Sequence, residues 1–257
     1  MIEALFNDLS ETKEVEAIAL GGSRAENRYD EKSDYDIYVY ITAPIDEEVR
    51  KNILKKHCRT IEVGAQFWEL EDNCVLNDGV GIDIIYRYLD SFSEEVAEVV
   101  EKHKQKNAYT TCMWHNLKTC RIIYDRNGRL EQAKKRFDIP YPAELKANII
   151  NNNMKLLHGA LPAYDMQIIK AVNRGDRNSV NHRIAGFMET YFDVIFAINE
   201  MTHPGEKRLV NICKEECKIL PENFEENINS LFRNAFTNPR KLKDDLYKIT
   251  NALIFII

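Results

Sequence analysis

Two aspartates, Asp34 and Asp36, stand at the start of a segment rich in β-branched and aromatic residues, SDYDIYVYIT. Side chains alternate along a strand, so both carboxylates point to one face, about 7 Å apart at roughly 3.3 Å per residue. Two like charges held this close repel each other unless a cation lies between them. Divalent ions such as Mg²⁺ prefer oxygen ligands. The pattern predicts a metal-binding pair, although a bare D-x-D also occurs at solvated strand ends.

A small turn, Gly21-Gly22-Ser23, precedes these aspartates at the end of the apolar segment VEAIAL. Glycines let backbone N–H groups approach an anion closely, and Ser23 adds a hydroxyl. Carboxylates suited to a divalent metal and a turn suited to phosphate therefore occur in one short segment. Together they predict a site for a metal-bound nucleotide.

The turn, the polar loop after it and the motif SDYDIYV resemble the signature of the DNA polymerase β-like nucleotidyltransferase superfamily. The resemblance implies that Gly22, Ser23 and Arg24 contact a nucleoside triphosphate, with ATP the expected donor. It also implies that Asp34 and Asp36 bind two Mg²⁺ ions, which stabilise the attacking and leaving oxygens of an in-line displacement.

A third carboxylate is expected from a later strand, and Asp83 in GIDIIYR has a suitable place for it. Alternation puts Asp83 on the face opposite Ile82 and Ile84, which have the character of core residues. Asp83 is therefore expected as a metal ligand, as the general base, or as both. Relatives that use glutamate at this position leave its role as base open, and a strand aspartate paired with an arginine is the structural alternative.

The elements that must position these residues change character near Pro140. Before it, strand and helix patterns mix; after it, apolar residues recur every three or four positions, as in helices. The chain is therefore expected to be α+β, with a nucleotidyltransferase domain at 1–140, built on a mixed sheet with flanking helices, and a helical bundle at 141–257. In the first domain, helices are expected at 2–10, 43–58 and 91–105, and strands at 15–20, 34–42, 60–70 and 81–90.

This layout resembles the antibiotic-modifying members of the superfamily, the aminoglycoside and lincosamide nucleotidyltransferases. The segment FAINEMTHPGEKRL resembles a part of their helical domains in which a lysine follows a proline turn. That resemblance implies that Lys207, together with Arg208, approaches the nucleotide phosphates.

The expected reaction is metal-dependent transfer of a nucleoside monophosphate to a hydroxyl, with release of pyrophosphate. The resemblance implies a small-molecule acceptor such as an aminoglycoside- or lincosamide-like antibiotic, and AMPylation of a partner protein such as a toxin is the alternative. A nucleic acid is an unlikely partner, because the net charge is −6 and no basic stripe is visible.

A second class of function is suggested by RNSVNH, in which Arg177 and His182 have the spacing of HEPN-type ribonucleases. On an ideal helix these two positions lie about 140° apart, so they do not share a face. Helical-bundle ribonucleases therefore remain the weaker alternative to nucleotide transfer.

Composition limits the remaining possibilities. The chain has 257 residues, of which 44% are hydrophobic, as in a globular protein, and no apolar run approaches the roughly 20 residues that cross a bilayer. The acidic N-terminal segment is unlike a signal peptide, so a cytoplasmic location is expected. The six cysteines are expected as reduced thiols, and neither Cys213 with Cys217 nor the CMWH motif offers a convincing zinc set.

Overall fold

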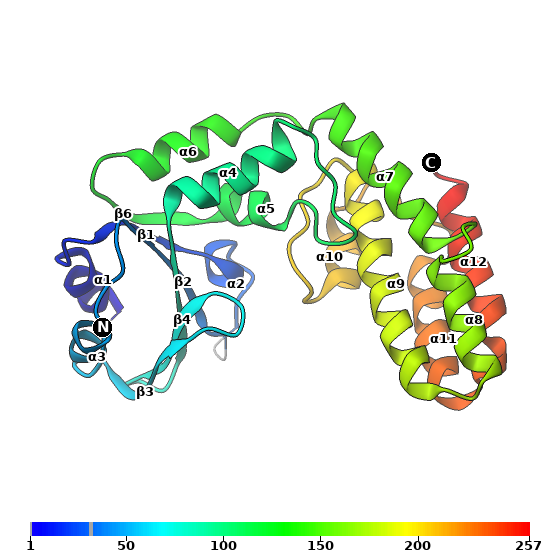
Figure 1. The fold of residues 1–257 in the computed structure, drawn as a ribbon, viewed down its shortest axis with the longest axis horizontal. Coiled ribbons are helices and arrows are strands. Elements are labelled where there is room, and N and C mark those ends of the chain that lie inside the picture. Colours follow the sequence, from blue (N-terminus) through cyan, green and yellow to red (C-terminus); the bar gives the residue numbers. More distant parts are fainter. Residues whose placement is uncertain (1, 31–32) are drawn as a thin grey trace. The chain divides into compact units, whose positions relative to one another are not determined.

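The computed structural model describes residues 2–30 and 33–257. By the packing of its backbone, the chain divides into two compact units, an α+β unit and a helical unit, which confirms the predicted fold class (Figure 1). The α+β unit comprises Met1–Ala97 and Met113–Ile139, and the helical unit comprises Glu98–Cys112 and Pro140–Ile257.

A mixed sheet of six strands forms the centre of the α+β unit, in the order β3-β4-β5-β2-β1-β6. Neighbours are antiparallel except for β2 and β5, which run parallel. This one parallel pair places the starts of β2 and β5 at the same end of the sheet. The strands are β1 (Val15–Leu20), β2 (Tyr35–Ile41), β3 (Cys58–Ala65), β4 (Leu70–Leu76), β5 (Gly81–Arg87) and β6 (Arg121–Asp125).

Helices cover the sheet of the α+β unit on two sides (Figure 1). On one face, α1 and α3 contribute Leu5, Leu9 and Leu54 to a core with the sheet. On the other, Phe92 of α4 packs against Tyr40, with ring centroids 5.7 Å apart. The helices are α1 (Ile2–Ser10), α2 (Gly22–Ala25), α3 (Glu47–Leu54), α4 (Leu89–Val100), α5 (Cys112–Thr119) and α6 (Arg129–Phe137).

The predicted alternation holds in β5, where Ile82, Ile84 and Tyr86 are buried and Asp83 lies on the opposite face. In β2 the prediction of a single core face was incomplete. Tyr38 and Tyr40, on the same face as the aspartates, are also buried, because helices cover that face further along the strand. The face therefore stays open only near the start of β2.

Several elements differ from the sequence-based expectation. The helix expected at 43–58 is shorter, because Asp46 caps it by accepting a hydrogen bond from the Glu48 N–H. The strand expected at 60–70 covers most of β3 and the turn to β4, which form a hairpin, and the stretch after residue 111, for which no element was predicted, forms α5, β6 and α6. α6 is nevertheless amphipathic, with Leu130 and Phe137 as its buried residues. Tertiary contacts also stabilise this part of the chain, such as the hydrogen bond from Trp114 Nε1 to the Phe137 carbonyl, 2.9 Å.

The helical unit buries its own core of aliphatic and aromatic side chains, with Tyr191 packed against Phe187 and Phe224. The segment 98–112 belongs to this unit although it precedes residue 140, since Thr110 donates two hydrogen bonds to the buried Asp193. The helices are α7 (Ala143–Leu157), α8 (Tyr164–Asn173), α9 (Arg177–Ile198), α10 (Leu209–Glu216), α11 (Phe224–Thr237), the 3₁₀ turn η1 (Pro239–Lys241) and α12 (Leu242–Ile254). In the described part of the chain, no helix has the length and apolarity needed to cross a membrane.

Candidate active site

Two of the predicted carboxylates, Asp36 and Asp83, are direct register partners on the parallel strands β2 and β5. Neighbouring strands lie about 4.8 Å apart, and both residues lie on the face opposite the α1/α3 core. Each side chain is partly exposed. The pairing of β2 with β5 therefore brings together carboxylates that are far apart in the sequence.

The third carboxylate, Asp34, precedes β2 and is exposed, but its side chain is directed to β5. Its Oδ1 atom lies 2.2 Å from the position that a Cβ atom on Gly81 would occupy. Glycine at position 81 therefore leaves the space into which the Asp34 carboxylate extends. The start of β5 thus meets Asp34 at Gly81 and Asp36 at Asp83.

The glycine turn packs against the same carboxylate face. The N–H of Gly21 donates to the Asp36 carbonyl, 2.8 Å, and a Cβ on Gly21 would lie 2.3 Å from the Tyr38 ring. Gly22 has φ +59°, and a Cβ there would lie 1.8 Å from Asp36 Oδ2. Both glycines are therefore required by the close approach of the turn to β2, and Ser23 follows as a partly exposed residue of α2.

The guanidinium of Arg24, for which the sequence predicts a phosphate contact, donates within its own loop. Nε and Nη2 donate to the Ser33 carbonyl at 2.9 and 2.7 Å, and Nε also reaches the Asp34 carbonyl at 3.2 Å. The guanidinium carbon lies 4.0 Å from the centroid of the Tyr35 ring. These contacts connect α2 to the segment that presents Asp34.

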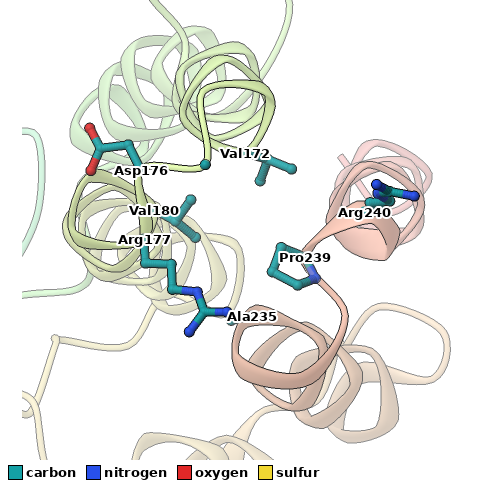
Figure 2. Close-up of a pocket in the computed structure, with 8 residues that line it drawn as sticks. Val172, Asp176, Arg177, Val180, Ala235, Pro239 and Arg240 are labelled. Carbon is teal, nitrogen blue, oxygen red and sulfur yellow. The ribbon is translucent and has the colours of Figure 1, made fainter.

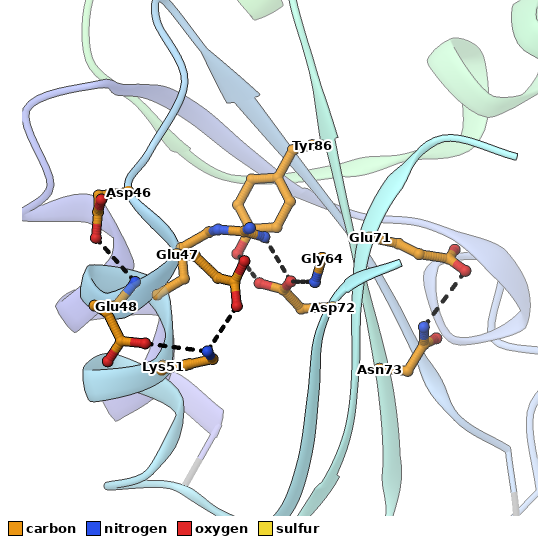
Figure 3. A network of polar contacts seen from close by, with 10 residues as sticks. Asp46, Glu47, Glu48, Lys51, Gly64, Glu71, Asp72, Asn73 and Tyr86 are labelled. Atoms are coloured by element: carbon orange, nitrogen blue, oxygen red, sulfur yellow. Dashed lines mark hydrogen bonds and ion pairs between the residues drawn. The ribbon is translucent and has the colours of Figure 1, made fainter. Parts of the chain in front are cut away.

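Asn73 is a polar residue of this face that sequence reasoning missed. It is the register partner of Asp83 on β4, and its Nδ2 donates to Glu71 Oε1 at 3.4 Å (Figure 3). The sequence EDNCVL shows no clear alternation of polar and apolar residues, because the buried Asp72 is itself polar, and it was not recognised as a strand. Asn73 extends the row of polar side chains from Asp36 through Asp83 to a third strand.

A different carboxylate, Asp72, lies on the opposite face of the sheet and is fully buried. It accepts hydrogen bonds from Arg50 Nη1 at 2.5 Å, the Gly64 N–H at 2.9 Å and the Tyr86 hydroxyl at 2.9 Å (Figure 3). Burial raises the pKa of Asp72, and its donors oppose that shift. Asp72 is held by protein groups alone, so its place is structural.

The donor set at the start of β2 and β5 consists of carboxylate oxygens, which suit Mg²⁺. Asp36 and Asp83 are in register, and glycines at 22 and 81 leave space that the carboxylates of Asp36 and Asp34 enter. Among residues 2–30 and 33–257, no three His, Cys, Asp or Glu side chains are gathered tightly enough to form a metal site as they stand. The residue types and their placement fit a divalent ion that would draw the carboxylates together.

The remaining sequence-predicted residues belong to the helical unit. Lys207 and Arg208 lie exposed in the segment before α10, and their predicted phosphate contact stays a prediction. Arg177, at the start of α9, lines a pocket of about 220 Å³ and extends toward Ala235 of α11 (Figure 2). His182 is exposed and is not among the lining residues, so this pocket does not join the two halves of the ribonuclease-like motif.

The cysteines are free in the structure, and their reduced state stays a prediction. Four of them are buried, and the other two, Cys112 and Cys217, are partly exposed. The absence of a three-ligand group among the described residues applies to these thiols as well. Cys58 and Cys74 pack in the core of the α+β unit, and Cys213 packs in the core of the helical unit.

Comparison with protein families finds two matches that together span most of the chain. Residues 2–107 match the nucleotidyltransferase domain, and residues 107–209 match a domain of unknown function. The first match includes the glycine turn and all three aspartates. The prediction of a nucleotidyltransferase from the residues is thereby confirmed for the N-terminal part of the chain.

Solved structures offer more distant likenesses. A nucleotidyltransferase-like protein from Exiguobacterium sibiricum is 12% identical, with a TM-score of 0.44, over 99% of this chain and 73% of that one. An aminoglycoside 6-adenyltransferase from Bacillus subtilis is 11% identical, with a TM-score of 0.30, over 99% of this chain and 89% of that one. At these TM-scores nothing about the acceptor of this chain follows from either protein. No curated protein matches the sequence.

Proposed function

Because the N-terminal part of the chain is a nucleotidyltransferase domain, we propose that the protein transfers a nucleoside monophosphate from a nucleoside triphosphate to an acceptor hydroxyl. One observation carries the proposal: Asp36 and Asp83 are register partners beside a glycine turn that packs against Asp36. The expected donor is ATP. The expected acceptor is a small molecule with hydroxyl groups.

Asp34, Asp36 and Asp83 are the residues that would hold divalent magnesium. A bound magnesium ion supplies charge stabilisation to a transferring phosphoryl group. Without a bound metal, the three carboxylates concentrate negative charge at the start of β2 and β5. That charge favours metal binding and repels a metal-free triphosphate, so nucleotide and metal are expected to bind together.

The glycine turn is the element proposed to face the triphosphate. Gly22 has no side chain to exclude a ligand, and Ser23 follows with a hydroxyl donor. Backbone N–H groups in such a turn can approach phosphate oxygens closely. These residues would bind and orient the donor in the transfer reaction.

Asp83 is also the residue proposed to take the proton of the acceptor hydroxyl. It is partly exposed, and it lies between Asp36 on one neighbouring strand and Asn73 on the other. A general base within hydrogen-bond reach of a hydroxyl contributes roughly 10²–10⁴-fold to the rate. Asn73 offers an amide beside it that can orient the same hydroxyl.

The test follows pyrophosphate release with each labelled triphosphate, Mg²⁺ and a panel of hydroxyl-bearing small molecules, with a partner-protein fraction as a separate arm. We expect release that requires Mg²⁺, stops with EDTA and is lost when both Asp34 and Asp36 are changed to alanine. Asp138→Asn, an exposed aspartate after α6, is the matched control and should behave as wild type.

His182→Ala separates this proposal from the ribonuclease alternative. His182 is exposed on α9, so its loss should leave pyrophosphate release largely intact. RNA cleavage that survives EDTA and the aspartate changes, but disappears in His182→Ala, would overturn the proposal, because imidazole can move protons near neutral pH without a metal.

A further inference from the structure

We infer that Arg24 is a positioning residue for the carboxylate of Asp34, an inference that rests on the proposed metal role of Asp34. Arg24 belongs to α2, directly after the glycine turn, whereas Asp34 follows a polar loop. The guanidinium joins these two segments of the site. The guanidinium of Arg24 therefore holds the backbone at Ser33 and Asp34, directly before β2 begins at Tyr35.

Within the described part of the chain, the hydrogen bonds of Arg24 go to backbone carbonyls. Ser33 accepts at its carbonyl from both Nε and Nη2, 2.9 and 2.7 Å away, and the Asp34 carbonyl accepts from Nε at 3.2 Å. Charged donors on carbonyl oxygens make stronger hydrogen bonds than neutral donors do. The peptide groups before and after the Asp34 Cα are therefore both held by one side chain.

Two tyrosines hold the guanidinium in its plane. Its central carbon lies 4.0 Å from the ring centroid of Tyr35 and 4.8 Å from that of Tyr29. Arginine stacks on aromatic rings and presents a rigid fork of donors, whereas a lysine ammonium does neither. The arrangement thus uses the planar shape of arginine as well as its charge.

Two further hydrogen bonds hold Ser33 beside this contact. The Ser33 N–H donates to the Asp30 carbonyl at 3.1 Å, and the Ser33 hydroxyl donates to Asp30 Oδ1 at 3.2 Å. On the other side, the Asp34 carboxylate enters the space left by Gly81. Backbone held by Arg24 and a side chain directed to Gly81 together define the place of Asp34.

Lysine at position 24 distinguishes positioning from phosphate binding. A lysine keeps the positive charge that a phosphate needs, but it loses the fork and the stacking. If Arg24 positions Asp34, Arg24→Lys and Arg24→Gln should weaken metal binding alike, by about 10–100-fold, as changes to residues that orient metal ligands do. If Arg24 binds phosphate, Arg24→Lys should retain most function and Arg24→Gln should raise the KM for the triphosphate.

The direct measurement is a Mn²⁺ titration of the nucleotide-free protein, followed by the electron paramagnetic resonance signal of free Mn²⁺. We expect Arg24→Lys to raise the Kd for Mn²⁺ by about 10–100-fold. Tyr35→Leu should raise it too, whereas Tyr35→Phe, which keeps the ring, should match wild type. Arg28→Lys, an exposed arginine of the same loop, is the control.

The outcomes separate this inference from the proposed function. If Asp36→Asn weakens Mn²⁺ binding but Arg24→Lys and Tyr35→Leu do not, the inference about Arg24 is wrong and the metal site stands. If wild type binds no Mn²⁺, or Asp36→Asn binds it equally well, the proposed function fails first. Each variant is compared at equal folded fraction, determined from its melting curve.

Discussion

Asp36 and Asp72 are both strand aspartates of the same sheet, but they lie on opposite faces and have opposite surroundings. Asp72 is fully buried and is held by Arg50, the Gly64 N–H and the Tyr86 hydroxyl. Asp36 is partly exposed, is the register partner of Asp83, and has its carboxylate against Gly22. A buried carboxylate with protein donors stabilises the fold, whereas partly exposed carboxylates on adjoining strands suit an external cation.

The helical unit contains an intermediate case in Asp193. It is buried and accepts hydrogen bonds from Thr110 and Asn153, but no cationic partner is recorded for it among the described residues. Burial raises the pKa of Asp193 to about 6, although these hydrogen bonds oppose the shift. The comparison therefore predicts a different effect for each aspartate. Changing Asp36 should abolish activity, removing the partner of Asp72 should lower stability, and Asp193 should make stability depend on pH.

The largest effect is expected for Asp36→Asn, which keeps the shape of the side chain but removes the charge that a cation needs. We expect pyrophosphate release to fall on the order of 10³-fold or more, as for essential groups of other active sites. The unfolding free energy should change by less than about 0.5 kcal/mol, because the residue is partly exposed. Steady-state kinetics test the loss of pyrophosphate release, and urea unfolding tests the small change in stability. Near-normal turnover would contradict the proposed metal role of Asp36.

The opposite pattern is expected for Arg50→Met, which leaves Asp72 buried without its cation. Breaking a buried ion pair by removing one partner costs about 3–5 kcal/mol. Transfer by the remaining folded protein should be unchanged, since Arg50 contacts the other face of the sheet. Lys51→Met is the matched control on the same helix; its partly exposed pairs with Glu47 and Glu48 should be worth at most about 1 kcal/mol.

The third expectation concerns pH and Asp193. In the unfolded chain an aspartate has a pKa of about 3.9, whereas in the folded protein the pKa of Asp193 is raised to about 6. Between these values only the folded state holds the proton, so this residue's contribution to the unfolding free energy is greatest below pH 4. It is lost as pH rises through 6, and amounts to about 3 kcal/mol.

Asp193→Asn removes this titration, so the comparison of the two proteins isolates it from other carboxylates. The unfolding free energies of wild type and Asp193→Asn are compared by urea unfolding from pH 4.5 to 7.5. Wild type should lose stability relative to Asp193→Asn as pH rises, and the difference should level off above pH 7. A difference independent of pH would mean that Asp193 does not titrate in this range.

The smallest effect is expected for Gly81→Ala. The added methyl group would occupy the space that Asp34 Oδ1 enters, so the carboxylate must move, whereas the strand can accept alanine. We expect a Kd for Mn²⁺ raised by about 10-fold, as when a metal ligand is displaced without being removed. In the Asp34→Ala background Gly81→Ala should have no further effect, because coupled residues are not additive.

Local sequence patterns were sufficient for the elements with strong periodicity. The alternation in 81–87 identified the buried face of β5, and the recurring apolar residues after 140 identified the helices of the second unit. The hairpin of β3 and β4 was missed because β4 places the polar Asp72 on its buried side, which hides the alternation. No element was predicted for α5, β6 and α6, although α6 is amphipathic, with Leu130 and Phe137 buried. The segment 98–112 was expected within the domain 1–140, and in the structure it packs with the helical unit, where Thr110 donates to Asp193.

Residue types and short spacings by themselves determined that this chain has a glycine turn, an Asp-x-Asp strand and a later strand aspartate, because side-chain alternation and glycine's freedom are local properties. Tertiary structure alone decided that Asp83 pairs with Asp36, that Gly81 makes room for Asp34 and that Arg24 holds the Ser33 and Asp34 carbonyls. It also decided which strand aspartate is buried. Strand register and helix packing depend on contacts between distant segments, and no local pattern contains them.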